Sequence, residues 1–210
     1  MEAAPRSSLL RRMVDFDTAL SLRIHSFFLF VPRPLLKALE ISGDGRLWFP
    51  LLLSLLPLTP SSPFPTALLL GSLLDLLLIG LLKHLIRRPR PVYNKGMSLA
   101  FAVDQWSFPS GHSSRVLFFA SFLALSSASI DLGTSFIWDF IRGEPVELVV
   151  FLVFLWSATT SISRVLLGRH FVFDVVAGAA LGVLEALFVF SFLNFEALHE
   201  YLRGNWLPSL

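Results

Sequence analysis

An all-α integral membrane bundle of five or six transmembrane helices is the fold class that this sequence predicts. Of its 210 residues 54% are hydrophobic, the mean hydropathy is +0.70, and the apolar residues gather in long runs between short polar stretches. Soluble domains rarely combine such a composition with such bunching. The length suffices for one helical bundle and leaves no room for a second globular domain.

Four segments have the apolar character of a membrane-crossing helix, which needs about 20 mainly apolar residues. They are Thr66–His84, Ser110–Ile130, Leu148–Ile162 and Val172–Phe192. A fifth segment, Ile41–Leu58, is shorter, is apolar from Leu47 onward and contains two prolines. Between it and the next span, the serine- and proline-rich stretch Thr59–Pro65 predicts a tight turn outside the membrane.

The chain before residue 41 differs from these spans. From Met13 to Val31, apolar residues recur at helical spacing, while Asp17, Arg23 and His25 occupy other positions on the wheel. This pattern predicts an amphipathic helix in the membrane interface, and the polar residues near its middle make the alternative, a sixth span, costly. We therefore predict an N-terminal interfacial region (1–40), a transmembrane core (41–195) and a short C-terminal tail (196–210).

Charge and cysteine usage exclude several function classes. The net charge is only +2, and no basic run is interleaved with aromatic residues, so we expect no nucleic-acid partner. The chain has no cysteine, which excludes disulfides and a cysteine nucleophile. We expect membrane lipids as partners, and the sequence is compatible with a homo-oligomer.

The distribution of cations predicts the orientation. In a five-span arrangement only Arg142 and Arg203 lie on the side of the Asp131–Glu147 loop and the C-terminus, whereas all seven cations before Leu47 lie on the other side. Cytoplasmic loops carry the excess of Lys and Arg, so the cation-rich side is predicted to be cytosolic. We expect the protein in the endoplasmic reticulum membrane.

Three polar segments at the ends of predicted spans fall on this cytosolic side. The first runs from Lys83 to Arg90 and Pro91, the second is Ser107–His112, and the third runs from Ser163 to Asp174. Because all three flank spans on one side, they can converge on a single pocket at the membrane surface.

The residue types in these segments favour a phosphoryl group. Lys83, Arg90 and Arg164 supply cations, and guanidinium groups bind phosphate oxygens in bidentate fashion. Ser110 is a good helix cap, and Gly111 allows a ligand to approach the backbone. The amide groups at this helix start would attract an anion and stabilise charge that develops in the transition state.

The reacting groups follow from helical spacing. His170 and Asp174 are four residues apart at the start of a helix, so they share a face. A carboxylate on one ring nitrogen leaves the other nitrogen free to attack phosphorus, and His112 is placed to protonate the leaving oxygen and later to deprotonate water. This two-step transfer uses no metal and no cofactor.

Together these segments resemble the type 2 phosphatidic acid phosphatase and haloperoxidase superfamily. Its motif K-x6-R-P matches Lys83, Arg90 and Pro91, its motif P-S-G-H matches Pro109–His112, and its motif S-R-x5-H-x3-D matches Ser163, Arg164, His170 and Asp174. The resemblance implies phosphate-binding Lys83, Arg90 and Arg164, an acid/base His112, a nucleophilic His170 and an orienting Asp174. It implies a lipid phosphate or diphosphate as substrate.

Sequence around the motifs is similar to the polyisoprenoid (presqualene) diphosphate phosphatase branch, whose active site is expected to face the cytosol. That branch implies hydrolysis of farnesyl, geranylgeranyl or presqualene diphosphate. The alternatives are a phosphatase for phosphatidate, lysophosphatidate or sphingoid phosphates, and a catalytically silent scaffold of the same fold. A phosphate-linked transporter is a third class, which the clustering of cations on one side disfavours.

Several charged residues have competing interpretations. Contact with anionic lipid headgroups and binding of the substrate explain Arg87, Arg88 and Lys95 equally well. Arg115 and Arg169 lie beside motif residues in the sequence, so we interpret them as residues that hold the motif side chains in place. Asp75 and Glu185 lie inside apolar spans, and we favour a structural role in which each is protonated or bonds a neighbouring helix. The sequence Asp15-Phe16-Asp17-Thr18 superficially matches the D-x-D-x-T motif of aspartyl-phosphate phosphatases. It lacks the strand that this motif requires, so we interpret it as the polar face of the N-terminal helix.

Overall fold

The structure, a computed structural model, describes residues 9–58, 62–93, 105–128, 146–192 and 201. In these ranges the helices are α1 (Leu9–Phe27), α2 (Arg33–Ser42), α3 (Gly45–Leu55), α4 (Phe64–Ile86), α5 (Gly111–Ala128), α7 (Val146–Leu166) and α8 (Val172–Phe192). The β-structure of these ranges is limited to one isolated bridge, between Pro89 and Trp106. The prediction of an all-α fold is confirmed.

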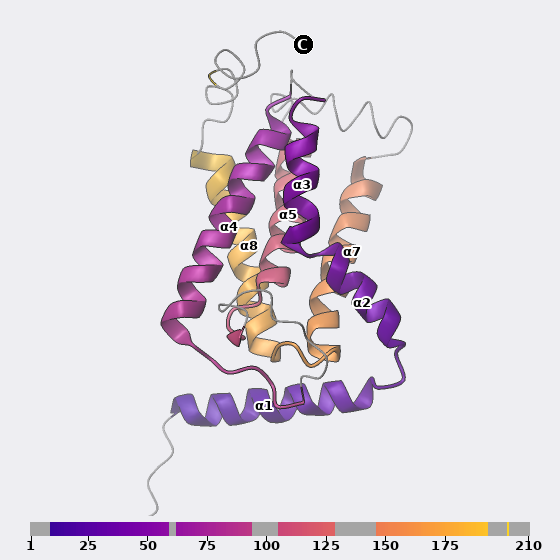
Figure 1. Ribbon diagram of the computed structural model, residues 1–210, viewed down its shortest axis with the longest axis vertical. Helices are drawn as coiled ribbons and strands as arrows, with labels where there is room; N and C mark the ends of the chain where they lie inside the picture. Colours follow the sequence, from indigo (N-terminus) through magenta and orange to yellow (C-terminus); the bar gives the residue numbers. More distant parts are fainter. Residues whose placement is uncertain (1–8, 59–61, 94–104, 129–145, 193–200, 202–210) are drawn as a thin grey trace, which may run out of the picture.

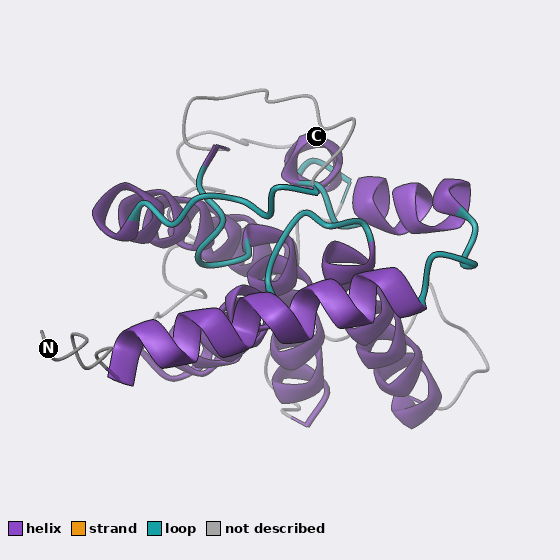
Figure 2. Cartoon of the chain, turned by 90° about the horizontal axis from the view of Figure 1, so that it is seen from below, coloured by secondary structure: helices purple, strands orange, loops and turns teal. Residues whose placement is uncertain are grey.

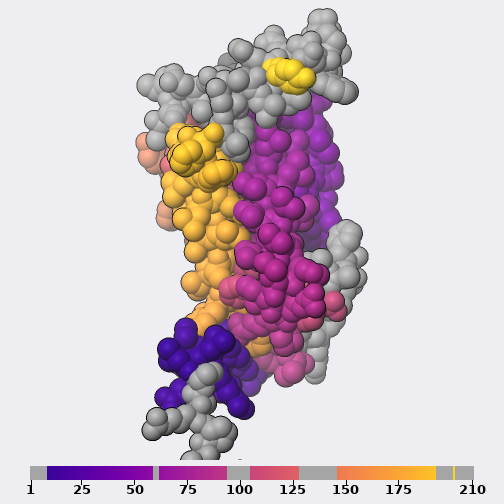
Figure 3. Space-filling model, turned by 90° about the vertical axis from the view of Figure 1, so that its left-hand side faces the viewer, coloured from indigo at the N-terminus to yellow at the C-terminus, as the bar shows by residue number. Residues whose placement is uncertain are grey.

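The long helices run side by side and α1 lies across one end of them (Figure 1). Helix α5 is central, in contact with α4, α7 and α8. Its phenylalanines Phe118, Phe119 and Phe122 form the middle of the hydrophobic core with Leu52 of α3 and Val189 of α8. The neighbouring helices α4 and α8 form one outer face of the bundle (Figure 3).

Three of the described helices, α4, α7 and α8, are long and apolar enough to cross a membrane, and α3 is a shorter apolar helix. They correspond to three of the predicted spans, and α5 to a fourth. Helix α4 begins at Phe64, so Pro65 belongs to its first turn and not to the predicted extramembrane turn. Proline is favoured there because the first amides of a helix have no intrahelical partner.

The predicted fifth span, Ile41–Leu58, is divided between two helices. Ile41 and Ser42 end α2, and α3 begins after a break at Gly43 and Asp44. The Asp44 carboxylate caps α3 by accepting a hydrogen bond from the Arg46 amide at 2.9 Å. The part of the predicted span that is apolar, from Leu47 onward, corresponds to α3, whereas the predicted start at Ile41 is wrong, because α2 ends at Ser42 and Asp44 caps a new helix.

Helix α1 packs against the bundle through polar residues. It runs across the ends of the other helices in the view from below (Figure 2). Asp17 and Ser21 are fully buried against the protein, whereas Val14 and Phe27 are exposed. The sequence analysis placed Asp17 on the polar face of this helix. In the structure that position faces the protein and not the solvent. The interfacial location of α1 stays a prediction.

Candidate active site

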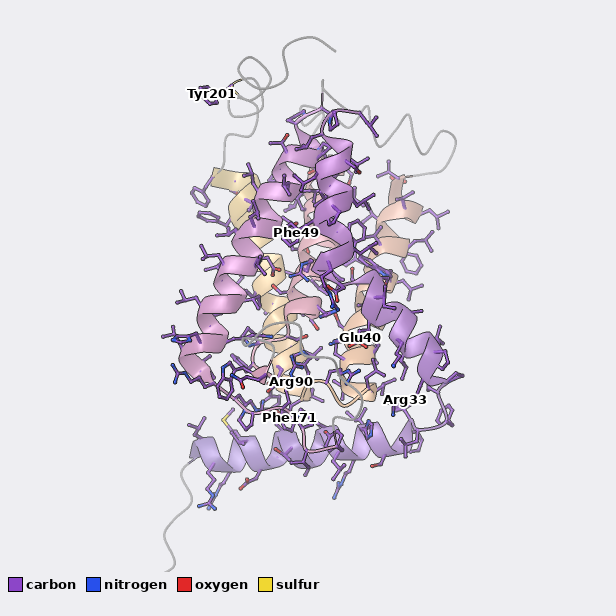
Figure 4. The ribbon with its side chains drawn as sticks, viewed as in Figure 1. Arg33, Glu40, Phe49, Arg90, Phe171 and Tyr201 are labelled. Carbon is purple, nitrogen blue, oxygen red and sulfur yellow. The ribbon has the colours of Figure 1, made fainter. Side chains whose placement is uncertain are left out.

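The three motif segments meet at the end of the bundle that α1 covers. Figure 4 shows Arg90 and Phe171 between this end and α1. Helix ends supply most of the side chains: the last turns of α4 and α7, the first turns of α5 and α8, and the loops between them. In chain order the predicted site residues gathered here are Lys83, Arg90, Ser110, Gly111, His112, Arg164, His170 and Asp174.

The loop between α7 and α8 presents His170 in a fixed position. Gly168 adopts a left-handed conformation (φ +72°), which glycine takes at no steric cost. The chain then turns so that the amides of Arg169 and His170 both donate to the Arg164 carbonyl, at 2.9 and 3.2 Å. This closed turn leaves the backbone of His170 little freedom.

The His170 ring has one engaged nitrogen and one that faces a cation. Its side chain is buried, with Nδ1 2.7 Å from the Ser107 carbonyl oxygen and Nε2 3.3 Å from Arg90 Nη1. Because a carbonyl can only accept, Nδ1 carries the proton and Nε2 the lone pair. Burial and the charges of Arg90, Arg164 and Lys83 hold the pKa of His170 well below its ordinary value.

Asp174 lies beside His170 but binds other groups more closely. Its Oδ2 accepts from the Phe171 amide at 2.9 Å, its Oδ1 lies 2.7 Å from Arg88 Nη1, and its distance to His170 Nδ1 is 3.7 Å. The nearest partner of Nδ1 is therefore the Ser107 carbonyl and not the carboxylate that the sequence indicated. Asp174 both caps the start of α8 and places a negative charge next to the ring.

Cations surround the two histidines. Lys83 and Arg164 are buried, and their charges act on the rings of both His112 and His170. Arg164 is held by Glu40 of α2, whose Oε1 lies 2.7 Å from Arg164 Nη1 and accepts from Arg169 Nε at 3.2 Å. Burial acts to raise the pKa of Glu40, but the two guanidiniums outweigh it and hold the pKa below its ordinary value.

The start of α5 is tied directly to the start of α8. The Ser110 amide donates to the Asp174 carbonyl at 2.9 Å, and the Ser110 hydroxyl oxygen accepts from the Ser113 hydroxyl at 3.0 Å. Any contact of Ser110 with a phosphate therefore has to come from its hydroxyl hydrogen. His112 Nε2 is buried and has no hydrogen-bond partner among the described residues, so it is available to a ligand.

Comparison with known proteins places this geometry in a family. The profile of the PAP2 superfamily matches residues 64–197, which include every motif residue of the site. The chain belongs to the PAP2 superfamily. It is 44% identical over 193 residues to the probable lipid phosphate phosphatase beta of Arabidopsis thaliana, a match that covers 87% of this chain and 91% of that protein.

Two crystal structures share the PAP2 fold of this chain. The first transmembrane PAP2 type phosphatidylglycerolphosphate phosphatase from Bacillus subtilis has a TM-score of 0.67, 22% identity, and coverage of 91% of this chain and 88% of that one. Aquifex aeolicus LpxE has a TM-score of 0.55, 24% identity, and coverage of 82% and 96%. The chain also matches the Arabidopsis thaliana lipid phosphate phosphatase gamma at 31% identity, over 60% of this chain and 54% of that protein.

Charged residues beyond the PAP2 motifs also have defined partners. Arg88 pairs with Asp17 and Asp174, and Arg87 folds back to donate to the His84 carbonyl at 2.8 Å. Arg115 of α5 pairs with Asp75 of α4 at 3.2 Å, which agrees with a structural role for Asp75 as a bond between helices. Lys95 lies outside the described residues.

Sequence reasoning missed three groups of this PAP2 site. Glu40 and the Ser107 carbonyl contact the motif residues Arg164 and His170, and Asp17 reaches the motif residue Asp174 through Arg88. Glu40 and Asp17 precede the motifs in the chain, and the third group is a backbone atom. The i, i+4 spacing of Asp17 and Ser21 was a usable signal, because it places two short polar side chains on one helix face. Glu40 offered none beyond its charge.

Proposed function

We propose that the protein is a membrane lipid phosphate phosphatase that acts through a phosphohistidine at His170. The observation that carries the proposal is the buried His170 ring, whose Nδ1 is bound to a carbonyl while Nε2 faces the Arg90 guanidinium. A neutral imidazole whose Nε2 carries a lone pair is a nucleophile, and the Arg90 guanidinium beside Nε2 attracts a phosphate. The relative from Arabidopsis thaliana, named a probable lipid phosphate phosphatase, supports the lipid substrate.

The reaction has two steps. In the first, His170 Nε2 forms a bond to phosphorus, the bond from phosphorus to the lipid oxygen breaks, and His112 gives its proton to that oxygen. In the second, His112 takes a proton from water, the oxygen attacks phosphorus, and the bond to Nε2 breaks to release inorganic phosphate. Lys83, Arg90 and Arg164 bind the phosphoryl oxygens in both steps.

The donor set of the site suits a metal-free reaction. The carboxylates of Asp17, Glu40 and Asp174 are each paired with a guanidinium, and the other charged groups that act on His170 are the cations of Arg90, Arg164 and Lys83. Hard divalent cations prefer several carboxylate or carbonyl oxygens. We therefore expect activity to survive EDTA and to fall with vanadate, which mimics five-coordinate phosphorus; restoration of an EDTA-treated enzyme by magnesium alone would contradict this mechanism.

The test of the proposed function is trapping of the intermediate. Wild-type protein incubated with a ³²P-labelled lipid phosphate and quenched should carry an acid-labile, base-stable label, and His170→Ala should lose both the label and turnover. His84→Ala is the matched control, because His84 is exposed at the end of α4. Equal labelling of His170→Ala would exclude His170 as the nucleophile.

A polyisoprenoid diphosphate is the substrate that we propose within this class. It is supported by the similarity of the motif surroundings to the presqualene diphosphate phosphatase branch and by the leaving group, because a monophosphate leaves more readily than an alkoxide. Arg87 and Arg88 do not add to this support, since they bind His84 and two carboxylates. The measurement is kcat/KM for farnesyl diphosphate and phosphatidate in the same micelles, and a tenfold preference for phosphatidate, about 1.4 kcal/mol, would favour the glycerolipid alternative.

A further inference from the structure

Helix α1 binds the start of α8 through two buried side chains. The Phe173 amide donates to Asp17 Oδ1 at 3.0 Å, and the Val172 amide donates to Ser21 Oγ at 2.9 Å. Both amides belong to the first turn of α8, where backbone donors have no intrahelical partner. Side chains of α1 thus cap, from outside, the helix that carries Asp174.

One guanidinium then joins α1 to the active site. Arg88 lies with Nη2 2.7 Å from Asp17 Oδ2 and Nη1 2.7 Å from Asp174 Oδ1, and its guanidinium stacks 4.0 Å above the Phe171 ring. Two carboxylates share this one cation, so the group as a whole carries one net negative charge. That charge adjoins His170 through Asp174, 3.7 Å from Nδ1.

The other charged groups around His170 are positive. Lys83 and Arg90 act on the ring from α4 and the segment after it, and Arg164 acts from α7. The neighbouring titratable group on α5 is His112. On the α1 side, the Tyr93 hydroxyl interacts electrostatically with Asp17, Asp174 and Arg88. The Glu40 carboxylate forms ion pairs with Arg164 and Arg169. Among the described residues, Asp174 is therefore the carboxylate that lies beside the His170 ring, 3.7 Å from Nδ1.

We propose that Asp17 is a positioning residue for the reaction: by sharing Arg88 with Asp174, it preserves the negative charge of Asp174 toward His170. The inference rests on the proposed phosphohistidine mechanism, in which His170 gains positive charge as it attacks phosphorus. If residue 17 were neutral, Arg88 would neutralise Asp174 alone and the developing charge would lose its counter-charge. Asp17 lies outside the segment 64–197 that matches the PAP2 profile, so it is an addition to the family motifs.

The test compares Asp17→Asn with Asp15→Asn in the full-length protein. Asparagine keeps an oxygen for the Phe173 amide and replaces the oxygen that faces Arg88 with an uncharged NH2 group, whereas Asp15 is exposed on the same helix. We expect Asp17→Asn to lower kcat about tenfold or more with KM nearly unchanged. The acid limb of kcat/KM should move to lower pH, because loss of a negative charge favours the neutral ring. Asp15→Asn should match the wild type. An unchanged kcat, or a change in KM alone, would overturn the proposal.

Two further measurements separate this inference from the proposed function. In an Arg88→Gln background the bridge is already broken, so Asp17→Asn should add little; a full second loss would show that Asp17 does not act through Arg88. Hydrogen exchange of the peptide that contains Val172 and Phe173 should be faster in Asp17→Ala, whatever the substrate. Unchanged exchange would overturn the docking of α1, whereas a wild type that turns over no lipid phosphate would instead refute the proposed function.

Discussion

At the residue scale, charged motif residues of the site form ion pairs with residues that do not belong to the family motifs. The motif arginine Arg164 is paired with Glu40, and the motif carboxylate Asp174 is paired with Arg88. The motifs predicted which residues gather, because spacing and span orientation bring their segments to one end of the bundle. They could not predict the partners, since an ion pair between distant segments leaves no periodic signal in either.

The ion pairs of Glu40 predict that Glu40→Gln lowers the stability of the protein and strengthens its inhibition by phosphate analogues. The change keeps the shape of the side chain but removes the counter-charge of Arg164 and Arg169, so the free energy of unfolding should fall by about 1–3 kcal/mol. The same loss raises the positive potential of the pocket, so inorganic phosphate and vanadate should inhibit several-fold more strongly. Thermal unfolding and inhibition constants check both effects. Glu147→Gln, which changes an exposed residue of α7, is the control; weaker inhibition in Glu40→Gln would indicate that Glu40 mainly orients Arg164.

The environment of His170 predicts where activity is lost in acid. Burial and the charges of Arg90, Arg164 and Lys83 lower its pKa, so the nucleophilic neutral ring persists to lower pH than an ordinary histidine near 6.5 would allow. After correction for ionisation of the substrate, the acid limb of kcat/KM should therefore lie below that value. Bound phosphate offsets the cations, so the acid limb of kcat should lie at higher pH than that of kcat/KM. Coincident limbs at the ordinary histidine value would contradict this environment.

At the element scale, the catalytic groups depend on how closely α5 and α8 approach. A Cβ at Gly178 would overlap the Ser110 carbonyl, and a Cβ at Gly182 would overlap the Ser114 carbonyl. This close approach lets the Ser110 amide reach the Asp174 carbonyl and places His112 and Asp174 at the same end of the bundle. The apolar runs predicted these helices well, because period and length are local properties. They did not predict the break at Gly43 and Asp44, because the end of α2 and the cap of α3 lie in a short polar stretch that precedes the apolar run.

The glycine contact predicts that Gly182→Ala separates α5 from α8. The added methyl group meets backbone, which cannot move aside as a flexible side chain can, so the unfolding free energy should fall by roughly 1–3 kcal/mol. Turnover should fall with it, because the distance between His112 and His170 changes. Gly80→Ala is the matched control, since a Cβ there has nothing within 4 Å. Thermal stability in detergent and kcat for both variants are the measurements, and equal behaviour of the two would contradict the close packing.

At the scale of the whole molecule, one end of the bundle holds the chemistry and the first helix covers it. Figure 4 places Arg90 and Phe171 at this end, between α1 and the long helices. The sequence predicted the common end from the alternation of spans and the distribution of cations. It did not predict that α1 docks there by Asp17 and Ser21, since that contact joins segments at opposite ends of the chain.

The distribution of cations predicts which compartment this end of the bundle faces. Of the seven cations before Leu47, five lie in α1 and α2, on the side of the site, Arg46 lies at the start of α3, and Arg6 precedes the described residues. None of these helices contains a motif residue that would require the cations for chemistry. Since Lys and Arg are retained on the cytosolic side, the active site should face the cytosol. An epitope tag inserted within residues 94–104 should be digested by protease added to sealed microsomes, whereas a tag within 131–145 should be protected until detergent is added. The reverse pattern would place the site in the lumen, and the cations would then have to be explained by substrate binding and by anionic headgroups on that leaflet.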